Sequence, residues 1–198
     1  MGRRLARGRE GTPYAVGVRA SVDDTVAQWC ADHRIAVLDT TTIWLADLSG
    51  MLGVLALAAV VWVSFAVWFG GWRPMLQVVL VLASVSLLTG WMKPVIDRPR
   101  PPADLALTQV TGSAMPSSHA LITSAIVVAV VMADWWGTAR LRRVVLAIGV
   151  VGCLLIGAAM VYMGAHWPSD VLVGWALGVG LTWPLMRVSS ARSPAARS

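Results

Sequence analysis

The sequence predicts an all-α integral membrane protein, a helical bundle of about five transmembrane helices preceded by an N-terminal interfacial helical segment. The first reason is composition. Of the 198 residues, 57% are hydrophobic and 13% charged, whereas a soluble domain usually has about 25% charged residues. The second reason is that apolar runs of roughly span length recur along the chain, whose mean hydropathy is +0.70. The single-domain length favours one compact bundle in lipid.

The first element is a polar segment over residues 1–50. Between residues 21 and 46, apolar positions alternate with charged ones such as Asp23, Asp32 and Arg34. This pattern predicts a helix at the membrane interface rather than one that crosses lipid. The basic start of the chain is not followed by an uncharged apolar stretch, so it lacks the pattern of a secretory signal peptide.

Five apolar runs form a membrane domain predicted over residues 51–187, and a short polar tail follows over residues 188–198. The runs cover residues 51–69, 75–92, 120–133, 144–163 and 171–186. We expect the second run to stop at Lys93 and Pro94, and a basic loop around Arg142 to precede the fourth. Because a span needs about 20 residues, the third and fifth runs reach that length only with their polar N-terminal ends.

The order of these spans gathers ionisable residues at one membrane face. If the spans cross the bilayer alternately, the second ends at Lys93 on the face where the third starts at His119. The fourth ends before His166 and the fifth starts near Asp170, again on that face. Ionisable residues inside or beside spans mark functional sites by default, so this face is the candidate site.

Three polar segments supply the chemistry. The first runs from Lys93 to residue 102 and contains several prolines, which predict a stiff, extended, basic loop. By itself, such a loop is more typical of contact with lipid head groups. The second includes Pro116, which suits the first turn of a helix, and is followed by Ser117, Ser118 and His119. A helix N-terminus binds phosphate well, although a serine-capped helix with an incidental histidine fits the same residues.

The third segment contains His166, Pro168 and Asp170. A carboxylate near an imidazole fixes its tautomer and makes its other nitrogen a better nucleophile. A purely structural His–Asp contact at a helix start is the alternative. Two histidines and an aspartate are also compatible with zinc, but Lys93 and Arg100 would repel a cation. The sequence therefore predicts an anion site with no metal and no cofactor.

The net charge of +6 comes from 15 arginines and one lysine against 10 acids. Arginines at span ends set topology and contact anionic lipids, so we expect membrane lipids and not nucleic acid as partners. A transporter is disfavoured because the ionisable residues gather at one face and not at the midplane. The oligomeric state is not indicated.

Together the three segments resemble the motifs of the type 2 phosphatidic acid phosphatase family, the membrane lipid phosphate phosphatases, which share their site type with soluble vanadium haloperoxidases. The family motifs are Lys-x6-Arg-Pro, Pro-Ser-Gly-His and Ser-Arg-x5-His-x3-Asp, and the resemblance covers roughly residues 51–187. The matching residues are Lys93, Arg100, Pro101, Pro116, Ser117, His119, His166 and Asp170. Ser118 replaces the motif glycine.

The resemblance implies a hydrolase that removes the phosphomonoester or pyrophosphate of a polyprenyl or glycerolipid phosphate. His166 would form a phosphohistidine, oriented by Asp170, and His119 would protonate the leaving oxygen and then activate water. The phosphate cradle implied by the resemblance consists of Lys93, Arg100, Ser117 and Ser118.

Two departures from the family pattern stand out. The Ser-Arg pair of the third motif falls on Ala159 and Met160, and losing a comparable donor costs about 10²–10³ in rate. A weak or inactive lipid-phosphate-binding relative is therefore the alternative function, unless Arg98 reaches the pocket instead. Family members also commonly have six spans, so the segment from residue 21 would stand in for the first helix.

Charge predicts the orientation. The face opposite the motifs carries Arg73, Arg140, Arg142, Arg143, Arg187, Arg192 and Arg197. By the positive-inside rule, the motif face is extracytoplasmic, and the expected location is the plasma (inner) membrane. The basic extreme N-terminus does not fit this orientation if it lies on the motif face.

Overall fold

The computed structural model describes residues 21–48, 72–133 and 136–191, and these parts of the chain contain helices and no strand. The helices are α1 (Val22–Asp32), α2 (Ala36–Leu48), α4 (Trp72–Ile96), a short 3-10 helix η1 (Ala103–Leu105), α5 (Ser118–Met132), α6 (Ala139–Tyr162) and α7 (Pro168–Ala191). The predicted all-α membrane bundle is confirmed. The apolar run over residues 51–69 lies outside the described residues.

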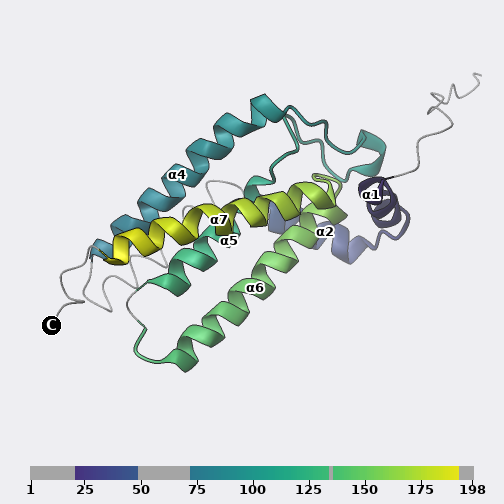
Figure 1. Cartoon of the computed structure of the whole chain (residues 1–198). Helices are drawn as coiled ribbons and strands as arrows, with labels where there is room; N and C mark the ends of the chain where they lie inside the picture. Colours follow the sequence, from purple (N-terminus) through teal and green to yellow (C-terminus); the bar gives the residue numbers. More distant parts are fainter. Residues whose placement is uncertain (1–20, 49–71, 134–135, 192–198) are drawn as a thin grey trace, which may run out of the picture.

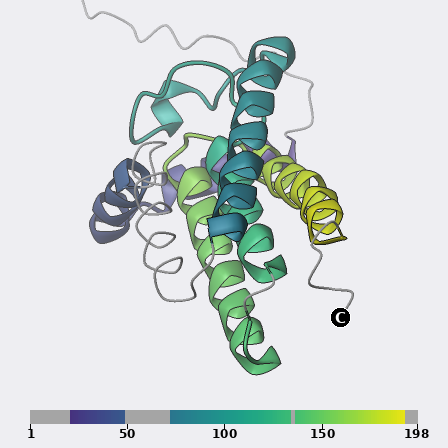
Figure 2. The ribbon, with the colours of Figure 1, turned by 90° about the vertical axis from the view of Figure 1, so that its left-hand side faces the viewer.

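Helix α5 is the centre of the bundle. It packs against α4, α6 and α7, and these long helices can be followed side by side in Figure 1 and in the view turned by 90° (Figure 2). The buried residues of α5 are Ala120, Leu121, Ile122, Ser124, Ala125, Ala129 and Val131. Because most of these side chains are small, neighbouring helices approach closely, as is usual in membrane bundles.

The outer surface of the bundle is apolar. On α6, for example, Ile148 is 67% exposed and Leu155 is 62% exposed, which suits lipid as the surrounding solvent and not water. Helices α6 and α7 are each long and apolar enough to cross a membrane. Helix α5 has 15 residues, or about 22 Å at 1.5 Å per residue, and therefore needs its flanking segments to cover the bilayer. The number of spans stays a prediction.

Three helix boundaries differ from the predicted ones. Helix α4 does not stop at Lys93 but continues through Pro94 to Ile96; a proline so near the end removes only one of the last helical hydrogen bonds. The chain then turns at Asp97, which has a φ of 43°. The arginines around Arg142 lie inside α6, which begins after the cap residue Thr138, and not in a loop. Helix α7 extends into the predicted tail.

The N-terminal segment forms two helices and not one. Ser21 and Asp24 make a reciprocal capping box at the start of α1. After α1, the Arg34 guanidinium donates to the Leu105 carbonyl at 2.6 Å, and the Ile35 N–H donates to the Tyr162 hydroxyl at 2.9 Å. These contacts hold the segment against the end of the bundle where α7 begins (Figure 1).

Close contact between α5 and α7 depends on glycine. A Cβ added at Gly178 would lie 2.1 Å from Ser124 Oγ and 2.4 Å from the Leu121 carbonyl oxygen. At Gly174 it would lie 2.7 Å from the Ser117 carbonyl oxygen. Any side chain at these two positions would force the helices apart, and the start of α7 would move away from the start of α5.

We therefore predict that Gly178→Ala destabilises the protein by about 2 kcal/mol, because the added methyl group overpacks the α5–α7 contact. The measurement is thermal unfolding in detergent. Gly180→Ala is the matched control on the same helix, since an added Cβ there meets nothing within 4 Å. Equal melting temperatures for the two variants would contradict the prediction.

Candidate active site

The ends of several helices meet at one end of the bundle. The Ser117 N–H, just before α5, donates to the carbonyl oxygen of Asp170 in the first turn of α7 at 3.1 Å. The Leu107 N–H, in the loop after α4, donates to the Met163 carbonyl oxygen at the end of α6 at 2.8 Å. The order of the spans predicted that these segments lie at one end of the bundle, and the structure brings them together there.

His166 lies in the turn between α6 and α7 and is only 4% exposed. Its Nδ1 is 3.7 Å from Asp170 Oδ2, and its Nε2 is 3.4 Å from Arg100 Nη1. Burial lowers the pKa of His166 below its usual value; Asp170 opposes this shift, whereas the charges of Arg100 and Lys93 add to it. Burial therefore favours the neutral form of the imidazole, whose Nε2 faces Arg100.

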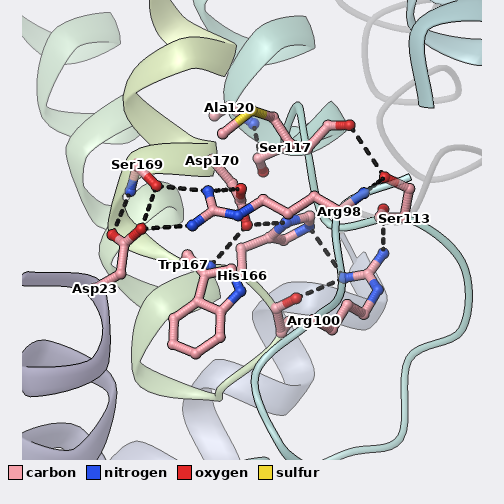
Figure 3. Close-up of polar contacts among 12 residues, drawn as sticks. Asp23, Arg98, Arg100, Ser113, Ser117, Ala120, His166, Trp167, Ser169 and Asp170 are labelled. Carbon is pink, nitrogen blue, oxygen red and sulfur yellow. Dashed lines mark hydrogen bonds and ion pairs between the residues drawn. The ribbon is translucent and has the colours of Figure 1, made fainter. Parts of the chain in front are cut away.

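Asp170 is completely buried and uses both carboxylate oxygens (Figure 3). Oδ1 accepts from Arg98 Nη1 at 2.6 Å, and Oδ2 accepts from the Trp167 N–H at 2.8 Å. The bond from Arg98 compensates the negative charge of the carboxylate, which would be costly to bury without a cation. The bond from the Trp167 N–H caps the start of α7. These contacts fix the carboxylate beside His166 Nδ1.

Arg98 is directed away from the predicted phosphate cradle. Its Nη1 also donates to Ser169 Oγ at 2.6 Å, and its Nη2 pairs with Asp23 Oδ2 at 2.7 Å. Its guanidinium lies 5.8 Å from the centre of the Trp167 ring. Arg98 therefore supports Asp170 and does not replace the missing third-motif arginine.

Sequence reasoning missed Asp23. This residue lies on α1, 75 positions before Arg98. The capping box occupies Asp24 with Ser21 at the start of α1, but it does not indicate that the neighbouring Asp23 meets a residue of the bundle. Only the docking of α1 against the start of α7 reveals the contact.

Arg100 is held by three backbone carbonyls. Nε donates to Gly112 O at 2.9 Å, Nη1 to Ala165 O at 2.5 Å and Nη2 to Ser113 O at 3.3 Å. These bonds leave N–H groups available beside His166, because a guanidinium has five donors. Lys93, half-buried in the last turn of α4, is the second cation whose charge acts on His166.

The start of α5 carries the remaining predicted residues. Ser117 is the N-cap residue; it is fully buried, and its hydroxyl accepts a hydrogen bond from the Ala120 N–H at 3.5 Å. Ser118 and His119 form the first turn and are half-buried. Pro116 precedes the cap and so is not in the first turn as expected. First-turn N–H groups lack intrahelical partners, so this end offers anion-binding donors.

Met160 occupies the position of the family arginine and is 1% exposed. Its side chain belongs to an apolar cluster with Ala120, Met163 and Val171. Its carbonyl accepts hydrogen bonds from the Ala165 and His166 N–H groups at 3.1 and 3.2 Å. The residue therefore shapes the turn that holds His166 but adds no positive charge to the pocket.

Fold and site together define a class: an all-helical membrane protein with a buried His–Asp pair beside a cationic side chain at one end of the bundle. More specifically, the chain belongs to the PAP2 superfamily, whose family model matches residues 74–194, more than half of the chain.

Individual relatives agree with this membership. Residues of the chain are 30% identical over 92 positions to an undecaprenyl-diphosphatase from Sulfolobus acidocaldarius, a match that spans 45% of this chain and 40% of that protein. The fold is similar to that of a transmembrane PAP2-type phosphatidylglycerolphosphate phosphatase from Bacillus subtilis, with a TM-score of 0.77, 22% identity, and coverage of 87% of this chain and 86% of that chain. For Aquifex aeolicus LpxE the TM-score is 0.68 at 19% identity, over 84% of this chain and 96% of that chain.

The buried ion pair yields a prediction. Arg98→Met should destabilise the protein by about 3 kcal/mol, because it leaves the Asp170 carboxylate buried without its cation. Chemical denaturation in detergent measures this loss, with the exposed Arg142→Met as control. In an Asp170→Asn background, the cost of Arg98→Met should shrink; an undiminished cost would show that Arg98 does not act through Asp170.

Proposed function

We propose that this protein is a membrane phosphatase that hydrolyses the phosphomonoester or pyrophosphate of a lipid through a phosphohistidine intermediate. The main support is the position of His166 between a carboxylate and a guanidinium. Its Nδ1 is 3.7 Å from Asp170 Oδ2, and its Nε2 is 3.4 Å from Arg100 Nη1. A neutral imidazole with a carboxylate behind it and a guanidinium in front is arranged to attack a bound phosphoryl group.

In the first step, His166 Nε2 forms a bond to phosphorus while the bond between phosphorus and the leaving oxygen breaks. His119 donates its proton to that oxygen as general acid. The imidazole ring becomes cationic, and the Asp170 carboxylate stabilises this charge through Nδ1–H. A separation of 3.7 Å is long for a hydrogen bond, and such contacts often tighten only when substrate binds.

In the second step, His119 accepts a proton from water, and the water oxygen attacks phosphorus. The bond between phosphorus and Nε2 breaks, which releases phosphate and restores His166. Throughout, Arg100, Lys93 and the N-terminus of α5 stabilise the charge on the phosphoryl oxygens. In this scheme Ser117 acts as the N-cap residue that orients α5. The backbone N–H of Ser118 donates a hydrogen bond to a phosphoryl oxygen. No step needs a metal ion or a cofactor.

The substrate class follows from the setting of the site. It lies at the end of an apolar bundle, so the molecule that carries the phosphate would be a membrane lipid, either a polyprenyl or a glycerolipid phosphate. Similarity to an undecaprenyl-diphosphatase and to a phosphatidylglycerolphosphate phosphatase supports both alternatives. The arginine distribution further supports a site on the extracytoplasmic side of the membrane. The membrane that we propose is the plasma (inner) membrane.

The test is phosphate release from lipid phosphates in detergent with a chelator and no added metal. We expect wild-type turnover and its abolition in His166→Ala, because the nucleophile is removed. His33→Ala, which changes an exposed histidine at the C-cap of α1, is the matched control and should retain full activity. Undiminished release by His166→Ala would refute the mechanism.

A second candidate function is non-catalytic binding of lipid phosphates, and the apolar burial of Met160 supports it. We expect instead a slow wild-type enzyme whose rate rises in Met160→Arg, by up to about 10²-fold if the new cation reaches the phosphate. Met163→Arg, in the same apolar cluster, is the control. Lipid-phosphate binding without release by the wild type would establish the second candidate.

A further inference from the structure

A charged network connects the N-terminal helix to the proposed nucleophile. Asp23 on α1 accepts hydrogen bonds from Arg98 Nη2 at 2.7 Å, from the Ser169 N–H at 3.0 Å and from the Ser169 hydroxyl (Figure 3). The same guanidinium donates to Asp170. One arginine is therefore shared between a carboxylate of α1 and the carboxylate that faces His166.

The charges in this network do not simply cancel. Arg98 by itself would neutralise Asp170 and so weaken its pull on the proton of His166. Adding Asp23 gives two carboxylates around one guanidinium, so this network has a net negative charge and ends at the carboxylate that faces His166. Asp23 stays ionised: burial opposes its ionisation, but hydrogen bonds from Ser169 and Arg98 outweigh burial and hold the pKa of Asp23 below its usual value.

Anchoring of α1 does not depend on this contact alone, because α1 has other attachments. Ala27 and Cys30 on its inner side are buried, and the contacts of Arg34 and Ile35 tie its C-terminal end to the bundle. Asp23 is also buried more deeply than an anchoring surface residue needs to be, with 15% of its side chain exposed.

We propose that Asp23 is a positioning residue, which fixes the Arg98 guanidinium against Asp170 and thereby sets the orientation and basicity of His166. This inference rests on the proposed function in one respect, the role of His166 as nucleophile. It gives the N-terminal helix a part in catalysis although α1 lies outside the residues matched by the family model.

The first readout is independent of turnover. In histidine-labelled protein in detergent micelles, NMR titration follows His166, assigned with the His166→Ala variant. The charged groups that act on it are Asp170 from α7, Lys93 from α4 and Arg100 from the following loop. None of these changes in Asp23→Asn, so we expect the pKa of His166 to fall by about half a pH unit as one negative charge is lost.

The second readout is kinetic. Asp23→Asn should lower kcat for lipid phosphate release about tenfold with KM unchanged, as expected when a charged hydrogen bond is lost. Asp23→Glu keeps the carboxylate and should recover most of the rate. Asp24→Asn is the matched control: it removes the same charge one residue further along α1, from an exposed side chain, and should leave both readouts unchanged.

The outcomes separate this inference from the proposed function. No phosphate release by the wild type would refute the function, while the His166 titration would still decide the role of Asp23. An unchanged titration in Asp23→Asn would overturn the positioning role. Equal losses in Asp23→Asn and Asp24→Asn, with equal falls in melting temperature, would reduce Asp23 to a structural residue.

Discussion

The buried carboxylate of Asp170 is the group on which the arrangement of the site depends. It is completely buried, and an isolated carboxylate cannot be kept ionised in such a place without a cation and hydrogen-bond donors. Arg98 and the Trp167 N–H provide them. Because Arg98 belongs to the loop after α4 and Trp167 to the turn before α7, satisfying this one charge holds two distant segments in contact.

Packing deeper in the bundle provides the precision that this contact needs. Gly174 and Gly178 let α7 lie directly against the backbone of α5, so the starts of the two helices are level and Ser117 can bond to Asp170. The helix that carries His119 is thereby placed beside the turn that carries His166. The contacts around His166 thus depend on small residues deeper in the apolar bundle.

The pocket differs from the family pattern in how its positive charge is distributed. Met160 places an apolar side chain where the family motif has an arginine, and the Arg98 guanidinium pairs with Asp170. The remaining cations are Lys93 and Arg100, and the three carbonyls around Arg100 fix it in advance. The candidate site therefore has fewer cations than the family motifs, and backbone contacts hold one of them, Arg100, in a fixed orientation.

Much of this protein was determined by the sequence alone. Apolar runs predicted the helical bundle, and their order predicted that Lys93, His119, His166 and Asp170 gather at one end, because successive spans must alternate in direction. The motif spacing indicated the family. Boundaries such as the end of α4 were less predictable, since a proline in a last turn costs too little to stop a helix.

Tertiary structure alone decided how the charges pair. Arg98 had two possible roles in the sequence, and Asp23 was one acidic residue among several on a polar segment. Which of them meet depends on where α1 docks and on which way each side chain points. Both follow from the need to compensate a buried charge across segments 75 residues apart, and no local pattern records such a requirement.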